Sequence, residues 1–170
     1  MEHTILFGAD AIAGEVRRLA SAIDEESTKS LVVVTVLKGA VVFSSDLVRA
    51  MDTETELVFV SASSYVDGFT PGTELTVRKD GTLGVEDRHV LIVEDIVDTG
   101  RTLQALQETI QEERPASIRT VALVDKTVRR SGSFNPTYTG FHITDEFIYG
   151  YGLDWDQRFR DLPFIAIANP

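Results

Sequence analysis

Apolar residues follow one another along the chain at two different spacings. Continuous runs rich in β-branched residues occupy positions 31–37 and 90–93. Runs of this kind are typical of strands that are buried on both faces of a parallel sheet. Apolar residues then recur at helical spacing between positions 103 and 110. The pattern therefore predicts strands and helices that alternate along the chain.

Two further helices fit this alternation. Residues 10–23 place their apolar side chains on one helical face and their charged side chains on the other. Another helix is predicted directly after the strand at 31–37, so strand, turn and helix occur at least twice in succession. This order favours parallel βαβ units, and we expect an α/β fold with a mainly parallel central sheet flanked by helices. Further strands are predicted at 56–61, 75–77 and 117–124.

Length and charge narrow the class of protein. The 170 residues suit a single domain over positions 1–170, and the absence of cysteine excludes disulfides and thiolate metal sites. We find neither a membrane-spanning apolar stretch nor a signal peptide, which predicts a cytoplasmic protein. A net charge of −11 argues against nucleic-acid binding. It also means that an anionic substrate must meet local positive charge or a metal ion.

The stretch at 90–103 reads VLIVEDIVDTGRTL and carries the clearest chemistry. Its apolar run ends in Glu94 and Asp95, two carboxylates that need water, a cation or hydrogen-bond donors. A small polar turn at 98–102 then leads into a helix. A helix N-terminus at the carboxyl end of a strand, with a glycine that permits close backbone approach, suits a phosphate group. The neighbouring carboxylates suit hydroxyl groups or Mg²⁺.

Other interpretations of this stretch stay open on these residues alone. The turn could belong to a receiver-like or another phosphate-binding protein, or Asp98 could simply cap the helix. A P-loop is disfavoured because no Gly-Lys-Ser/Thr sequence follows the glycine.

The same stretch resembles the motif of the type I phosphoribosyltransferases that binds 5-phosphoribosyl 1-pyrophosphate (PRPP). The resemblance implies that Glu94 and Asp95 bind the ribose hydroxyls. It also implies that the following turn cradles the 5′-phosphate and that Asp98 is the catalytic residue. The residues of this turn are Asp98, Thr99, Gly100, Arg101 and Thr102.

Two further turns are similar to those of the purine phosphoribosyltransferases. Lys38 and Gly39 follow the strand at 31–37, where that group holds pyrophosphate in a Leu-Lys-Gly turn whose Leu-Lys peptide is often cis. Lys126 follows the strand at 117–124, at the position of the lysine that donates to the purine 6-oxo group. Taken alone, each lysine would be interpreted as a surface residue beside an ordinary turn.

The segment at 145–167 reads DEFIYGYGLDWDQRFRDLPFIAI and resembles the C-terminal hood of hypoxanthine phosphoribosyltransferases. The resemblance implies that Phe147 stacks on the purine and that backbone groups of Ile148 and Asp154 read the purine edge. It also implies that Arg160 holds pyrophosphate. We expect a small hood built from both chain ends. The candidate ligands of Mg²⁺ are then Glu94, Asp95 and Asp154.

A turn-rich stretch at 64–73 holds glycines and a proline and few large apolar residues. The family has a mobile loop with a Ser-Tyr pair, which Ser64 and Tyr65 match. The resemblance therefore implies a lid that closes over the reacting centre. We expect the lid to be mobile without ligands, because it cannot bury enough surface to offset its ordering entropy.

The resemblance implies an enzyme of purine salvage. It would transfer phosphoribosyl from PRPP to a 6-oxopurine, hypoxanthine and also guanine, and release pyrophosphate with the help of Mg²⁺. A homodimer or homotetramer is expected, with neither nucleic acid nor membrane as partner. Two rivals are a non-catalytic regulator that senses PRPP and an enzyme of the same fold that uses a pyrimidine, adenine or orotate. Lys126 and Phe147 disfavour the second rival.

Overall fold

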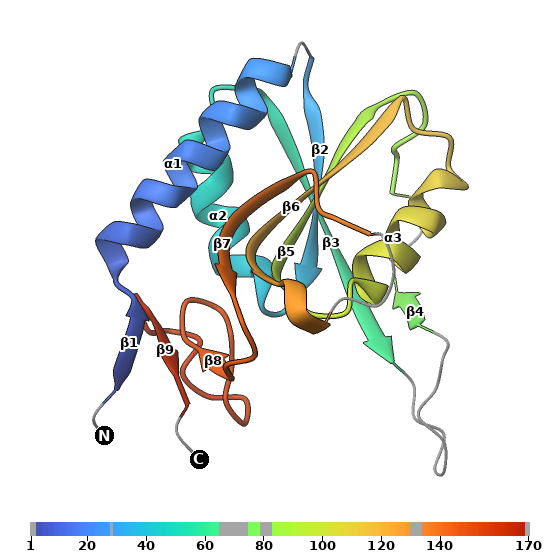
Figure 1. Cartoon of the computed structure of the whole chain (residues 1–170). Coiled ribbons are helices and arrows are strands. Elements are labelled where there is room, and N and C mark those ends of the chain that lie inside the picture. The colour runs from blue at the N-terminus through green and yellow to red at the C-terminus, as the bar shows by residue number, and fades with distance from the viewer. Residues whose placement is uncertain (1–2, 28, 65–74, 79–82, 130–133, 169–170) are drawn as a thin grey trace.

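A six-stranded sheet forms the centre of the molecule (Figure 1). The computed structural model describes residues 3–27, 29–64, 75–78, 83–129 and 134–168. The strand order is β4-β3-β2-β5-β6-β7, in which all neighbours are parallel except β4, which runs antiparallel to β3. The predicted mainly parallel sheet is confirmed. The strands are β2 Leu31–Leu37, β3 Thr55–Ser64, β4 Leu75–Arg78, β5 His89–Val97, β6 Ser117–Lys126 and β7 Tyr138–Ile143.

Helices cover both faces of this sheet (Figure 1). The helices α1 (Ala9–Glu26) and α2 (Ala40–Ala50) pack on one face, and α3 (Arg101–Gln111) packs on the other. A short 3₁₀ helix, η1 (Thr127–Arg129), follows β6. The predicted α/β layers are thus confirmed, although α1 extends beyond the predicted 10–23 at both ends.

Side-chain alternation along the inner strands explains why both faces need a helical cover. In β2, Leu31 and Val33 point into the core beneath α1 and α2, whereas Val32 and Val34 point into the core beneath α3. All four side chains are at most 1% exposed. A strand that is buried on both faces must be apolar at every position, which accounts for the continuous β-branched runs in the sequence.

A second, three-stranded sheet lies beside the first and forms the hood. Its order is β1-β9-β8, with antiparallel pairing throughout. The strands are β1 Thr4–Phe7, β8 Ile148–Tyr149 and β9 Ile165–Ile167. Because β1 and β9 pair directly, the two ends of the described chain lie side by side (Figure 1). The predicted hood from both chain ends is confirmed.

Two strands extend further than the sequence pattern predicted. The prediction ended β5 at position 93 and β6 at 124, but they run on to Val97 and Lys126. The pairing of β5 with β2 stops at Val93, yet its pairing with β6 continues to Val97. Because of this pairing with β6, Glu94 and Asp95 lie within β5 rather than in the turn that follows it.

A membrane span requires a helix of sufficient length and hydrophobicity. No helix among the described residues is long and apolar enough to cross a membrane.

Candidate active site

The carboxyl ends of the parallel strands gather the predicted site residues at one edge of the central sheet. The turn with Lys38 and Gly39 follows β2, the turn at 98–102 follows β5, and Lys126 ends β6. Because these strands are parallel, their carboxyl ends meet at the same edge, where open α/β sheets bind ligands. The hood begins after β7 at this same edge, so Phe147 belongs to the same region.

Glu94 lies inside β5 with its side chain directed to the α3 side of the sheet. The residue is 7% exposed, and it lines a cavity of about 90 Å³ together with Asp98, Thr99, Gly100 and Thr102. Its buried Oε2 atom has no hydrogen-bond partner among the described residues. Burial and the adjacent Asp95 charge raise the pKa of Glu94 well above its usual value. An acceptor of this kind is stabilised by a donor or a cation that enters the cavity.

Asp95 packs against the turn after β2. A Cβ atom placed on Gly39 would lie 1.6 Å from Asp95 Oδ2, so any larger residue here would displace this carboxyl group. The Ile96 amide donates to Asp95 Oδ1 at 2.8 Å. Burial raises the pKa of Asp95, and the positive charge of Arg160 opposes that rise. The structure thus brings Gly39, Asp95 and Arg160 together.

The turn after β5 presents the N-terminus of α3 to the cavity. Gly100 takes the left-handed conformation, with φ at +82°, and is the residue that immediately precedes the helix. The interpretation of Asp98 as the helix cap is wrong, because the N-cap is Gly100 and no side chain caps α3. Thr99 Oγ1 accepts a long hydrogen bond of 3.4 Å from the Arg101 amide. No acidic residue occupies the first turn of α3, so its positive dipole end is not neutralised locally.

A tight turn of the hood, at residues 150–152, packs against the turn that follows β2. Arg160 donates from Nη1 to the Gly152 carbonyl at 2.8 Å, and its Nη2 lies 2.7 Å from Asp154 Oδ1. A Cβ atom on Gly152 would lie 2.2 Å from the Gly39 carbonyl oxygen. The hood turn therefore rests directly on the turn after β2. Sequence reasoning gave Gly152 no role, although the Gly-Tyr-Gly pattern at 150–152 is a signal for left-handed backbone, and the three φ angles are +98°, +52° and +97°.

The remaining predicted residues differ in exposure. Lys126 is 7% exposed at the end of β6, so its interpretation as a surface lysine is wrong. Phe147 is 54% exposed, while Ile148 beside it is buried. The pKa of Glu146 is lowered, chiefly by local backbone and Thr144 hydrogen bonds and also by the Lys126 charge, which links Lys126 to the hood.

Three further expectations concern the Leu37–Lys38 peptide, the lid and the metal site. The Leu37–Lys38 peptide is cis, as the resemblance implied, and Lys38 itself is exposed. Tyr65 and the Ser64 side chain, the predicted lid pair, lie outside the described part of the structure. Within the described residues, no group of three or more histidine, cysteine or acidic side chains is arranged to hold a metal ion.

Comparison with known proteins identifies the family of this site. Residues 5–156 match the phosphoribosyl transferase domain. The hypoxanthine-guanine phosphoribosyltransferase of Streptococcus pneumoniae is 35% identical over 166 residues, covering 97% of this chain and 92% of that protein. The bifunctional protein TilS/HprT of Listeria innocua is 39% identical over 98% of this chain, and the chain spans 26% of the length of that protein.

Solved structures agree with the sequence relatives. A crystal structure of a hypoxanthine-guanine phosphoribosyltransferase from Bacillus anthracis matches with a TM-score of 0.90 and 34% identity, covering 99% of this chain and 100% of that chain. A hypoxanthine phosphoribosyltransferase from Staphylococcus aureus matches with a TM-score of 0.91 and 36% identity, covering 98% and 91%. The chain therefore belongs to the hypoxanthine-guanine phosphoribosyltransferase family of the type I phosphoribosyltransferase fold.

Proposed function

We propose that this chain transfers the 5-phosphoribosyl group of PRPP to a 6-oxopurine and releases pyrophosphate. The observation that carries the proposal is the edge where β2, β5 and β6 end. There the structure combines a cavity at a helix N-terminus, two buried carboxyl groups, an arginine and a buried lysine. Hypoxanthine and guanine are the proposed bases, giving IMP and GMP in a purine salvage reaction.

The turn after β5 suits the 5′-phosphate of PRPP. Its cavity of about 90 Å³ is lined by Thr99, Gly100 and Thr102, which offer backbone N–H groups and hydroxyl donors. The positive end of α3 favours the phosphate charge. Arg101 adds a cation at the same turn. Glu94, which lines this cavity, and the adjacent Asp95 are proposed to bind the two ribose hydroxyls, which can donate to their carboxyl oxygens.

The pyrophosphate end of PRPP fits the turn formed by Lys38 and Gly39 together with Arg160. Cations at these positions counter the charge that develops on the leaving group. Glu94, Asp95 and Asp154 are the proposed carboxylate ligands of Mg²⁺, which would take one or two of them together with water and the pyrophosphate oxygens of the substrate. The buried Glu94 Oε2 without a described partner fits such an ion. When bound, Mg²⁺ neutralises pyrophosphate charge.

The purine is proposed to lie between β6 and the hood. The Lys126 ammonium can only donate a hydrogen bond, so it suits a 6-oxo group and opposes a 6-amino group. The exposed Phe147 ring offers a face for stacking. Backbone groups of Ile148 and Asp154 would read the purine edge. Asp98 is proposed to accept the ring proton as general base.

We also propose that Ser64 and Tyr65 belong to a lid that excludes water during transfer, and that the enzyme acts in the cytoplasm as a homodimer or homotetramer. An exposed apolar face supports self-association. Leu57 and Phe59 alternate on β3 and are 42% and 49% exposed, with Leu37 nearby on the neighbouring strand. Exposed apolar patches commonly mark protein interfaces.

A coupled product assay tests the proposed function. The purified chain is mixed with PRPP, Mg²⁺ and hypoxanthine, and IMP and pyrophosphate are quantified together. The proposal expects equal molar amounts of both products, and neither product when hypoxanthine or PRPP is omitted. Binding of PRPP without any IMP would overturn the proposal in favour of a non-catalytic PRPP sensor.

A further inference from the structure

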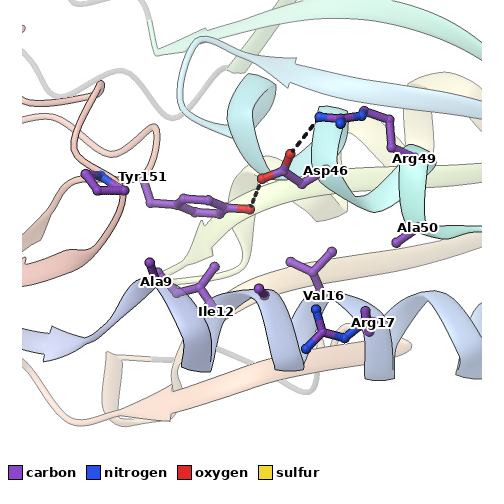
Figure 2. A pocket seen from close by; sticks show the side chains of 10 residues that line it. Ala9, Ile12, Val16, Arg17, Asp46, Arg49, Ala50 and Tyr151 are labelled. Atoms are coloured by element: carbon purple, nitrogen blue, oxygen red, sulfur yellow. Dashed lines mark hydrogen bonds and ion pairs between the residues drawn. The ribbon is translucent and has the colours of Figure 1, made fainter.

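The Tyr151 side chain extends from the hood turn toward α2. It points into a groove between α1 and α2 of about 390 Å³, where its hydroxyl donates to Asp46 Oδ2 at 2.7 Å (Figure 2). Asp46 also pairs with Arg49 at 3.6 Å on the surface of α2. Tyr151 is 6% exposed, so its ring is fixed by packing as well as by the hydrogen bond.

This hydrogen bond joins two segments that both reach the pyrophosphate end of the site. α2 begins at Ala40, directly after Lys38 and Gly39, and Asp46 lies in the second turn of that helix. Tyr151 lies between Gly150 and Gly152, within the turn that holds Arg160. The contact between the Tyr151 hydroxyl and the Asp46 carboxylate therefore connects α2, which follows the Lys38–Gly39 turn, to the hood turn that holds Arg160.

The hood turn packs closely on both of its neighbours, so even a small shift of the turn changes the position of Arg160. The Tyr151 amide donates to the Leu162 carbonyl at 2.9 Å, and the Gly152 amide donates to the Arg160 carbonyl at 2.9 Å. On one side a Cβ on Gly150 would collide with the Phe164 carbonyl oxygen at 2.1 Å, and on the other Gly152 contacts Gly39. A small rotation of the turn would therefore move Arg160 relative to Gly39.

We propose that Tyr151 and Asp46 are positioning residues for the pyrophosphate end of the substrate. They touch no proposed substrate group and act by holding Arg160 and Gly152 against the Lys38–Gly39 turn. Burial and the Asp46 carboxylate raise the pKa of Tyr151, so the hydroxyl remains a donor near neutral pH. The inference rests on the proposed transfer from PRPP and adds residues that the sequence resemblance did not point to.

The primary test is the Tyr151→Phe variant, which removes the hydroxyl and keeps the ring. We expect the KM for PRPP, and the KM for pyrophosphate in the reverse reaction, to rise by about three- to tenfold, as for loss of a typical intramolecular hydrogen bond. The KM for hypoxanthine should change by less than about twofold, because the proposed purine contacts lie elsewhere: Lys126 ends β6, Ile148 begins β8 and Phe147 precedes it. A merely structural role would lower the active fraction and leave both KM values unchanged.

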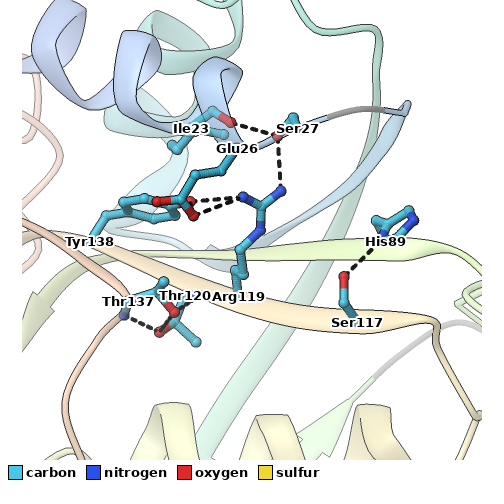
Figure 3. A network of polar contacts seen from close by, with 9 residues as sticks. All are labelled: Ile23, Glu26, Ser27, His89, Ser117, Arg119, Thr120, Thr137 and Tyr138. Carbon is cyan, nitrogen blue, oxygen red and sulfur yellow. Dashed lines mark hydrogen bonds and ion pairs between the residues drawn. The ribbon is translucent and has the colours of Figure 1, made fainter.

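Tyr138 provides a matched control. Its hydroxyl donates to Glu26 Oε2 at 2.6 Å, and the residue is 8% exposed, so it has the same chemistry at the α1–β7 contact (Figure 3). Arg119 and Ser27 complete that network away from the proposed site. Tyr138→Phe should lower the thermal midpoint, as we also expect for Tyr151→Phe, and should leave the KM for PRPP unchanged. Equal effects of both variants on that KM would overturn the inference.

Variants of Asp46 keep the inference testable if Tyr151→Phe folds poorly. Asp46→Asn retains a carbonyl acceptor and should keep the KM for PRPP within about twofold of the parent, whereas Asp46→Leu should match Tyr151→Phe. The double variant of Asp46→Leu with Tyr151→Phe should add no further increase, because both changes break one contact. Additive effects, or an unchanged KM in Asp46→Leu, would contradict the inference.

Calorimetric binding of PRPP with Mg²⁺ separates this inference from the proposed function. If the parent chain forms IMP and Tyr151→Phe binds PRPP as the parent does, the positioning role fails and the function stands. If the parent binds PRPP without forming IMP, yet Tyr151→Phe binds it about three- to tenfold more weakly, the function fails and the positioning role stands.

Discussion

Glu94 and Asp95 hold two adjacent carboxyl groups in a part of the sheet that is almost closed to solvent. Such a pair is costly unless donors or cations satisfy it. The sequence predicted acidic residues at this edge, since they interrupt an apolar run. It did not predict their burial inside β5, because that depends on pairing with β6, which lies more than 20 residues further along the chain.

Asp98→Asn tests the proposed general base at the residue scale. The substitution keeps the shape of the side chain and removes only its proton-accepting charge, so folding should be preserved. We expect the turnover number to fall by about 10²–10⁴-fold, the range typical of general-base catalysis. Asp10→Asn, a change of an exposed carboxylate on α1, is the control and should keep parental turnover. Parental turnover near neutral pH in pure Asp98→Asn would rule out Asp98 as the base.

Lys126→Gln tests the proposed contact with the 6-oxo group. The amide can donate or accept, so the preference for a 6-oxo over a 6-amino purine should weaken. We expect the KM for hypoxanthine to rise by about ten- to a hundredfold, with little change in PRPP affinity. Lys29→Gln, a change of an exposed lysine, should leave both unaltered. Unchanged base affinity and selectivity in Lys126→Gln would place the purine pocket elsewhere.

At the scale of elements, the sequence predicted best those helices and strands whose signal lies within a few neighbouring residues. The helical spacing of apolar residues predicted α1, and a continuous apolar run predicted β2. The contact between Tyr151 and Asp46 joins residues 105 positions apart, so neither the periodicity nor the spacing of motifs could indicate it. The same applies to Gly152, whose need for glycine comes from the backbone of Gly39.

Gly152→Ala tests how closely the hood turn packs on the turn after β2. The new Cβ would meet the Gly39 carbonyl oxygen at 2.2 Å in a left-handed backbone with φ at +97°. We expect a loss of about 2–4 kcal/mol in the free energy of unfolding, from overpacking and backbone strain together. Gly14→Ala in α1, which has room for a Cβ, should instead raise it by about 0.5–1 kcal/mol. Chemical denaturation measures both, and equal stabilities would contradict the described packing.

Asp24 connects the end of α1 to the loop before β3, and it gives this contact a pH dependence. The Asp52 and Thr53 amides donate to its carboxylate at 2.9 and 3.0 Å. Partial burial raises the pKa of Asp24, but the hydrogen bonds from Thr53 and Asp52 outweigh it and hold the pKa below its ordinary value of 3.8. A depressed carboxyl pKa stabilises the fold above that ordinary value, and this stabilisation is lost as the pH falls through the folded-state pKa.

Asp24→Asn should therefore lower the free energy of unfolding by about 1–2 kcal/mol at pH 7, in the range of hydrogen bonds to a charged group. The difference from the parent should shrink as the pH falls below about 4, where the parental carboxylate also becomes protonated. Asp52→Asn is the control and should not alter stability, because its backbone amide, which donates to Asp24, is retained. A loss in Asp24→Asn that is equal at pH 7 and pH 3 would contradict the charge-based account.

At the scale of the whole molecule, the sheet and the hood together form the proposed site. The central sheet supplies Glu94, Asp98 and Lys126 from its carboxyl edge, and the hood supplies Phe147 and Arg160. The hood exists because β1 pairs with β9, so residues from both chain ends must meet before this side of the site is complete. The resemblance predicted this arrangement, whereas periodicity alone indicated no more than short apolar runs near the C-terminal end.

The specificity constants for a panel of bases test the central claim most directly. The parent chain is assayed with PRPP and Mg²⁺ against hypoxanthine, guanine, adenine, orotate and uracil, and each nucleotide product is quantified by chromatography. We predict that kcat/KM for hypoxanthine exceeds that for adenine by at least about a hundredfold, because the buried Lys126 donor at the proposed purine site would reject a 6-amino group. Comparable values for adenine or orotate, or no nucleotide from any base, would contradict the account.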